Sequence, residues 1–195
     1  HYYEDADPEG SFIIIDPSSG KKQGDDCTIS HYSVCDSKPI FDELEAGTFT
    51  PLETIRAAIA LGLKRGTRLI AVEGVAYQST LLFWFDHYCE QEGISGFYFV
   101  ELSPKGQAKN NRIKRGLLQL LKGEILLHPS IRSKVLIQIM EWNPLTINNT
   151  DDVIDPIGYV DEILQEYPEL IVKSIFDVDS EPTESAHADT LALPF

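Results

Sequence analysis

The order of the apolar segments constrains the fold of this chain most. Residues 11–16 form a short, β-branched run between turn residues, and two more runs with strand character follow before any helical spacing appears. Helical spacing then separates the remaining strand-like runs. The segments expected as strands are 11–16, 27–35, 39–49, 67–72 and 97–102.

Apolar residues at helical spacing predict five helices. The clearest start is at Thr50 and Pro51, a capping residue followed by a proline suited to the first turn, and this helix should end near Gly66. The last helix is expected across the acidic motif "DDVIDPIGYVDEIL". The segments expected as helices are 50–66, 79–93, 111–121, 130–140 and 151–164.

This order predicts an α/β fold with a mixed five-stranded sheet. Three consecutive strands should pair antiparallel, whereas strands four and five, each reached through a helix, should run parallel to strand one by right-handed crossovers. Helices should then cover both faces. With strand one central and strand four beside it, Asp16 and Glu73 would emerge at neighbouring strand ends.

Length and composition favour a single folded domain. The 195 residues divide into a lead-in segment (1–10), a domain (11–176) and an acidic tail (177–195) that is expected to be flexible. The start at His1 suggests a piece of a longer protein. No apolar run approaches the roughly 20 residues of a membrane span. Three cysteines fit neither a disulfide framework nor a zinc site, so an intracellular protein is expected.

The basic residues are concentrated in one window. The chain has a net charge of −15, yet residues 105–134 contain eight basic residues and one acid, so this window carries +7 and the remainder −22. Such a window is either a solvated helix face or a surface that follows a phosphate backbone.

Two acids stand at the ends of apolar strands. Asp16 continues the buried row of Phe12 and Ile14, and with Pro17 it is either a turn-former or a metal ligand. Glu73 closes an apolar strand before Gly74, where an unpaired charge is unfavourable, so it is either a satisfied strand-end acid or a ligand.

The motif "DDVIDPIGY" supplies further acids. Helical spacing would place Asp152 and Asp155 on one face, whereas Asp155 before Pro156 also has the pattern of a helix cap. If these acids converge with Asp16 and Glu73, their repulsion requires a cation, and hard divalent ions with oxygen ligands fit. The histidines lack the spacing of a zinc site.

Four motifs together resemble a known family. They are "FIIIDPSSGKKQGDDCTI", "LIAVEGVAYQST", "KNNRIKRGLLQLLKGEILLH" and "DDVIDPIGY", and the resemblance that they carry runs from about Ser11 to Leu164, most of the chain. In this combination the sequence resembles the C-terminal nuclease domain of the large subunit of viral DNA-packaging terminases, a branch of the ribonuclease-H-like superfamily. The resemblance implies a ribonuclease-H-like fold and a metal-dependent endonuclease that cuts concatemeric double-stranded viral DNA.

The resemblance also implies roles for individual residues. Two Mg²⁺ or Mn²⁺ ions would be held by Asp16, Glu73 and either Asp155 or Asp152. Asp25 or Asp26 matches a second aspartate of the first motif, and Tyr77 with Gln78 matches an aromatic–Gln pair. Pro156 departs from the alanine common in the family, which leaves the choice between Asp152 and Asp155 open. The residues expected to contact the DNA backbone are Lys105, Lys109, Arg112, Lys114 and Arg115.

The expected partners follow from the same resemblance. They are double-stranded DNA, an N-terminal ATPase motor domain, the small terminase subunit and the portal protein, in the cytoplasm of the host cell. "SSGKKQG" does not match a phosphate-binding GxxxxGK[ST] loop, so we expect no ATP hydrolysis from this chain. The alternatives are a Holliday-junction resolvase or other strand-transfer nuclease of the same fold, and a non-catalytic module that docks DNA or proteins. A nucleotide-binding member of the sugar-kinase architecture ranks below these, because its paired phosphate loops are missing.

Overall fold

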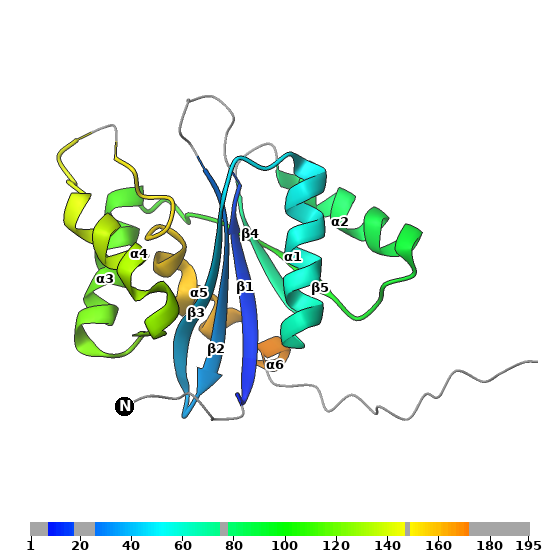
Figure 1. Cartoon of the computed structure of the whole chain (residues 1–195), viewed down its shortest axis with the longest axis horizontal. Coiled ribbons are helices and arrows are strands. Elements are labelled where there is room, and N and C mark those ends of the chain that lie inside the picture. The colour runs from blue at the N-terminus through cyan, green and yellow to red at the C-terminus, as the bar shows by residue number, and fades with distance from the viewer. Residues whose placement is uncertain (1–7, 18–25, 75–77, 147–148, 172–195) are drawn as a thin grey trace, which may run out of the picture.

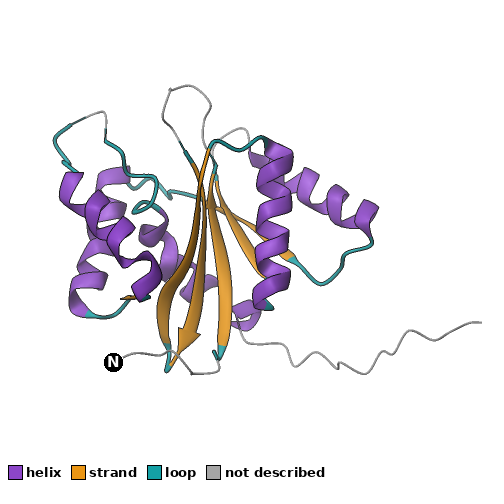
Figure 2. Cartoon of the chain, viewed as in Figure 1, coloured by secondary structure: helices purple, strands orange, loops and turns teal. Residues whose placement is uncertain are grey.

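A mixed β-sheet covered by helices on both faces forms the centre of the molecule (Figures 1 and 2). The computed structural model describes residues 8–17, 26–74, 78–146 and 149–171. Its sheet has the strand order β5-β4-β1-β2-β3-β6. The strands are β1 (Gly10–Asp16), β2 (Cys27–Cys35), β3 (Lys38–Gly47), β4 (Leu69–Glu73), β5 (Tyr98–Leu102) and β6 (Leu126–Leu127).

The pairing directions agree with the sequence-based topology. β1 pairs antiparallel with β2, and β2 with β3, whereas β4 runs parallel to β1 and to β5. The sheet has one strand more than predicted, since the short segment β6 pairs parallel with β3. The sequence indicates a short extended piece in "GEILLHP", but it does not show that this piece joins the sheet. Among the described residues no helix is long and apolar enough to cross a membrane.

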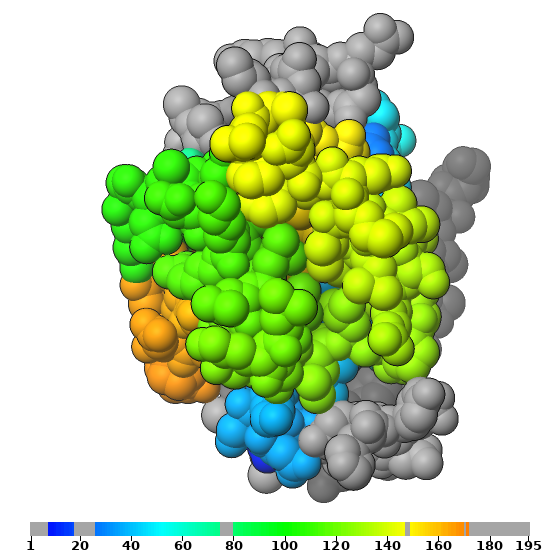
Figure 3. All heavy atoms as spheres, turned by 90° about the vertical axis from the view of Figure 1, so that its left-hand side faces the viewer, coloured from blue at the N-terminus to red at the C-terminus, as the bar shows by residue number. Residues whose placement is uncertain are grey.

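The helices are divided between the two faces of the sheet. Those described are α1 (Pro51–Arg65), α2 (Gln78–Glu92), α3 (Lys109–Lys122), α4 (Pro129–Glu141), the 3-10 helix η1 (Pro156–Tyr159), α5 (Val160–Glu166) and α6 (Pro168–Ile171). α1 and α2 lie on one side, and α3, α4 and α5 on the other (Figure 1). Figure 3 shows the second side, where α3 and α4 lie next to each other.

β1 is central because its side chains are apolar on both faces. Phe12 and Ile14 belong to the core beneath η1 and α3, whereas Ile13 and Ile15 belong to the core beneath α1 and α2, and all four are fully buried. Alternation therefore places Asp16 on the same side as Ile14, facing α3.

The ends of α1 follow the predicted signals. Thr50 accepts a hydrogen bond from the backbone of Glu53, whose side chain accepts one from the backbone of Thr50, and Gly66 closes the helix with φ of 68°.

The last predicted helix is different in the structure. Residues 151–155 form a turn, Pro156–Tyr159 is a 3-10 helix, and the α-helix begins only at Val160. Asp155 has helical backbone angles and its side chain makes no capping hydrogen bond, so the sequence-based interpretation of Asp155 as a helix cap is wrong. Its carboxylate is used elsewhere.

Candidate metal centre

Three carboxylates meet where β1 and β4 end. Asp16 and Glu73 are the last residues of these neighbouring parallel strands, and Asp155 precedes η1. One oxygen from each of the three lies within 4.8 Å of the others. We call Asp16, Glu73 and Asp155 the acidic cluster. Asp155 is fully buried, and Asp16 and Glu73 are half-buried.

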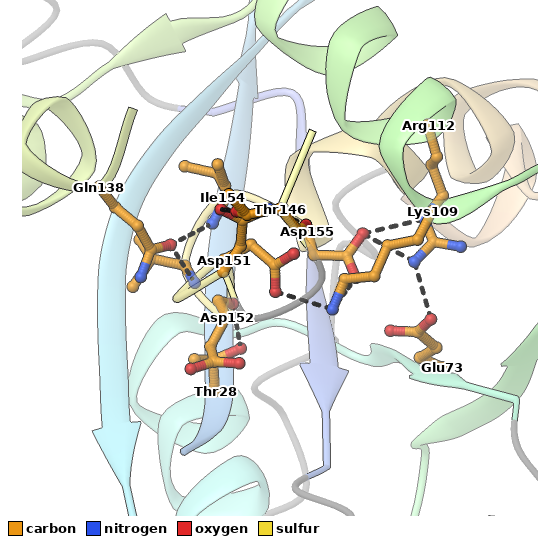
Figure 4. Close-up of polar contacts among 12 residues, drawn as sticks. Thr28, Glu73, Lys109, Arg112, Gln138, Thr146, Asp151, Asp152, Ile154 and Asp155 are labelled. Carbon is orange, nitrogen blue, oxygen red and sulfur yellow. Dashed lines mark hydrogen bonds and ion pairs between the residues drawn. The ribbon is translucent and has the colours of Figure 1, made fainter. Parts of the chain in front are cut away.

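The turn that carries Asp155 is held from two other elements (Figure 4). Gln138 of α4 accepts hydrogen bonds through Oε1 from the backbone N–H groups of Val153 and Ile154, at 2.7 and 2.9 Å. Thr28 of β2 donates to the carbonyl oxygen of Asp152 at 3.0 Å. These bonds satisfy buried backbone groups and fix the position from which Asp155 reaches the strand ends.

Arg112 of α3 connects two members of the acidic cluster. Its Nη2 donates to Glu73 Oε1 at 2.8 Å and to Asp155 Oδ1 at 2.7 Å, and its Nε donates to Asp155 Oδ1 at 3.0 Å. Its guanidinium carbon lies 4.1 Å from the centre of the Tyr159 ring, whose hydroxyl donates to Glu73 Oε1 at 2.8 Å. Arg112 is 3% exposed, so it is a fixed part of this site.

Two glycines allow α3 to approach η1 closely enough for these bonds. A Cβ atom on Gly158 would lie 2.5 Å from Cγ of Arg112, and one on Gly116 would lie 2.9 Å from the backbone nitrogen of Gly158. Both distances are shorter than van der Waals contact, so larger residues at these positions would push the helix away.

Lys109 supplies a second cation. Its Nζ lies 2.8 Å from Asp151 Oδ1 and 3.1 Å from Asp155 Oδ2, and its side chain is 47% exposed. Burial disfavours the charged form, but Asp155 and Asp151 outweigh it and raise the pKa of Lys109, so this side chain stays protonated.

The electrostatics of the acidic cluster favour an added cation. Burial and the neighbouring charges of Glu73 and Asp155 raise the pKa of Asp16 well above its usual range. Burial and Glu73 likewise raise the pKa of Asp155, against the opposing effect of Lys109 and Arg112. Both shifts mean that the ionised forms are insufficiently compensated by the protein's own groups.

The donor set also fits a hard divalent ion. Asp155 Oδ2 is buried and accepts no hydrogen bond from the described residues, although Lys109 Nζ lies 3.1 Å away. Three converging carboxylates, one of which carries a buried oxygen that accepts no hydrogen bond from the described residues, are the type of ligand that Mg²⁺ and Mn²⁺ prefer.

The remaining acids of the expected site lie around this cluster. Asp152 is 8% exposed, and its charge contributes to raising the pKa of Asp16, but it is outside the group of three converging oxygens. Asp26 is half-exposed just before β2 and is also outside the group. Gln78 begins α2, but its side chain lies outside the described part of the structure, as do Asp25 and Tyr77.

The basic residues expected to contact DNA divide into two groups. Arg112 is buried between carboxylates, and Arg115 donates to the carbonyl oxygen of Gly158 at 2.8 Å, so both contribute to the internal structure. Lys105 pairs with Glu162 and Glu166, Lys109 pairs with the acids described above, and Lys114 is exposed. The placement of Arg112 corrects the sequence-based expectation, because a buried guanidinium does not reach a DNA backbone.

Two contributors were not singled out from sequence. The sequence indicates Asp151 only as part of the acidic motif and gives no role to Tyr159. A helical spacing of four between Asp155 and Tyr159 was the available signal, but it does not indicate which side chain Tyr159 would contact.

The strand order and the helices on both faces define an α/β domain with a ribonuclease-H-like fold, and the acidic cluster lies at the carboxyl ends of its central strands. No family model matches the chain, and no curated protein matches its sequence. Solved structures do match. The large terminase of a thermophilic bacteriophage superposes with a TM-score of 0.60 at 12% identity, covering 84% of this chain and 42% of the phage chain.

A second match has nearly the same extent as this chain. The terminase nuclease domain of human cytomegalovirus, in a structure soaked with Mn and bound to an inhibitor, gives a TM-score of 0.57 at 15% identity, covering 84% of this chain and 86% of that domain. The fold of this chain is therefore that of terminase nuclease domains, and the chain spans less than half of the phage protein.

Proposed function

We propose that this chain is a metal-dependent endonuclease that cuts concatemeric double-stranded viral DNA during genome packaging. The observation that carries the proposal is the convergence of Asp16, Glu73 and Asp155 within 4.8 Å, with one buried oxygen of Asp155 accepting no hydrogen bond from the described residues. The fold shared with terminase nuclease domains supports the choice of substrate.

Two Mg²⁺ or Mn²⁺ ions held by these acids and by neighbouring aspartates, Asp152 among them, would supply the electrophilic chemistry of phosphodiester hydrolysis, activating a water and stabilising the leaving oxygen. The residues of the chain prepare this site. Arg112 and the hydroxyl of Tyr159 each bind Glu73 Oε1, and Arg112 also holds Asp155 Oδ1, so the carboxylates keep their orientation before a cation arrives.

The DNA backbone would be held by lysines near the acidic cluster. Lys105, Lys109 and Lys114 come from the start of α3 and the loop before it, and each is exposed enough to reach a phosphate. Contacts of this kind position the substrate without reading its sequence and weaken with salt. The ATPase motor, the small terminase subunit, the portal protein and the host-cell cytoplasm complete the proposed setting.

The test is plasmid nicking by the purified protein in Mg²⁺, in Mn²⁺ and in chelator. We expect nicking only with metal, and its loss in Asp16→Asn. Glu124→Gln is the matched control, because Glu124 is an exposed acid at the far end of α3. Wild-type protein that neither nicks DNA nor binds Mn²⁺ would point to a docking module. Preferential cutting of four-way junctions over linear duplex would point to a resolvase.

A further inference from the structure

Asp155 pairs with two cations that differ in their freedom to move. Arg112 binds Asp155 Oδ1 and its side chain is 4% exposed, whereas Lys109 lies next to Asp155 Oδ2 and its side chain is 47% exposed. Figure 4 shows the two side chains approaching Asp155 from α3. The two oxygens of one carboxylate thus face a fixed cation and a movable one.

Arg112 is fixed because several partners hold it at once. It stacks on Tyr159 and binds both Glu73 and Asp155, so moving it would leave two carboxylates without their buried partner. With all three carboxylates ionised, the acidic cluster and this guanidinium therefore sum to a formal charge of −2. A single divalent ion neutralises that charge without displacing any group.

Lys109 occupies a different position. Its ammonium lies between Asp151 Oδ1 and Asp155 Oδ2, at 2.8 and 3.1 Å, and these two oxygens belong to side chains that are 10% and 1% exposed. Two nearly buried carboxylate oxygens on one cation form a cation-binding position that is already filled. An ammonium on a flexible stem at a half-exposed site can leave it.

We propose that Lys109 occupies the second cation position of this site, between Asp151 and Asp155, and that a second divalent ion binds only when Lys109 leaves. This inference rests on the proposed function. It predicts two ions of unequal affinity, because the first meets uncompensated charge and the second must compete with an ammonium of the protein. A DNA phosphate near the start of α3 would offer Lys109 another partner and so favour the complete site.

The test is titration of the metal-free protein with Mn²⁺ in the absence of DNA. Binding is measured by calorimetry and by the electron paramagnetic resonance signal of free Mn²⁺. For wild type we expect one tighter and one weaker ion. In Lys109→Met the weaker ion should bind about tenfold more tightly, as expected when a half-exposed competing charge is removed, while the tighter ion is unchanged. Lys122→Met is the matched control, since Lys122 lies on the same helix with 54% side-chain exposure.

A second variant tests the other side of the same position. Asp151→Asn should weaken the second ion and leave the first unchanged, and circular dichroism in chelator shows whether each variant is folded. If Lys109→Met does not fold, Lys109→Gln replaces it. An unchanged second ion in the lysine variant, or an equal effect on both ions, overturns the inference and leaves the nuclease proposal standing. If no protein binds Mn²⁺, the proposed function fails as well.

Discussion

β1 and β4 have a polar cluster at each of their two ends, and the two clusters differ in whether the protein compensates the charge of their carboxylates. The acidic cluster lies at the carboxyl ends, with Asp16 and Glu73. At the other end lies a polar network formed by Ser11, His31, Ser33, Asp42 and Thr67. Both clusters contain a carboxylate on the same sheet, so their surroundings alone explain the difference.

In the polar network each of the five side chains lies within hydrogen-bond distance of another side chain of the network. Asp42 lies 2.5 Å from His31 Nδ1 and accepts a hydrogen bond from Ser33 at 2.5 Å. His31 Nε2 lies 2.8 Å from the hydroxyl of Thr67, which in turn lies 2.6 Å from that of Ser11. Burial alone would raise the pKa of Asp42, but the hydrogen bond and charge of His31 and the hydrogen bond of Ser33 outweigh it, and the pKa is lowered.

The comparison separates a polar cluster that stabilises the fold from the candidate metal centre. In the polar network the carboxylate is compensated within the protein, so its pKa falls and the fold gains stability. In the acidic cluster burial and like charges raise the pKa of Asp16, so the fold retains a repulsion that an external cation would relieve. Of the two clusters compared, the acidic cluster is thus the one whose charge the described residues leave uncompensated.

Glu73→Gln should give the largest effect on activity. We expect metal-dependent plasmid nicking to fall by roughly 10²–10³-fold, the typical cost of removing one group that stabilises charge in the transition state. Ser33→Ala in the polar network is the control and should retain the wild-type initial rate. Equal losses in both variants would mean that the two ends do not differ in function.

His31→Ala should give the largest effect on stability. The change leaves Asp42 buried without its main partner, so the free energy of unfolding should fall by about 3 kcal/mol. Urea unfolding in chelator measures it. His87→Ala on α2 is the control, because His87 is half-exposed and its ring lies against those of Phe83 and Trp84. A loss as small as that of the control would show that the network is not a stabilising unit.

Asp16→Asn should have a smaller effect on stability, of opposite sign. In chelator the variant lacks a repelled carboxylate whose pKa is raised on folding, so its free energy of unfolding should exceed that of wild type. Added Mn²⁺ should stabilise wild type and leave the variant nearly unchanged. Asp86→Asn, at an exposed position of α2, should change neither value.

The pH dependence of this difference tests its electrostatic origin. Because the pKa of Asp16 is raised on folding, the folded protein holds more protons than the unfolded chain between pH about 4 and the raised pKa. The free energy of unfolding of wild type should therefore fall, relative to Asp16→Asn, as pH rises through that interval. A pH-independent difference between the two proteins would contradict this origin.

Local sequence patterns were sufficient for most elements of the fold. The five longer strands and the ends of α1 were recognisable, because side-chain alternation and capping depend on residues close together in the chain. The segment 151–164 was expected as one helix, and the structure divides it into a turn, a 3-10 helix and an α-helix. In this geometry Gly158 packs directly against Arg112 of α3, and a local pattern does not contain that contact.

The sequence by itself determined that two acids end neighbouring parallel strands, since strand order and periodicity require it. Only the tertiary structure decided which side chains neutralise them. Arg112 and Asp155 are 43 residues apart in the chain, and their contact depends on the close approach of α3 and η1. The strength of an ion pair depends on the distance between the two charges in space and on their burial. Lys109 and Arg112 carry the same charge, but Arg112 is buried and fixed, whereas Lys109 is half-exposed and can move.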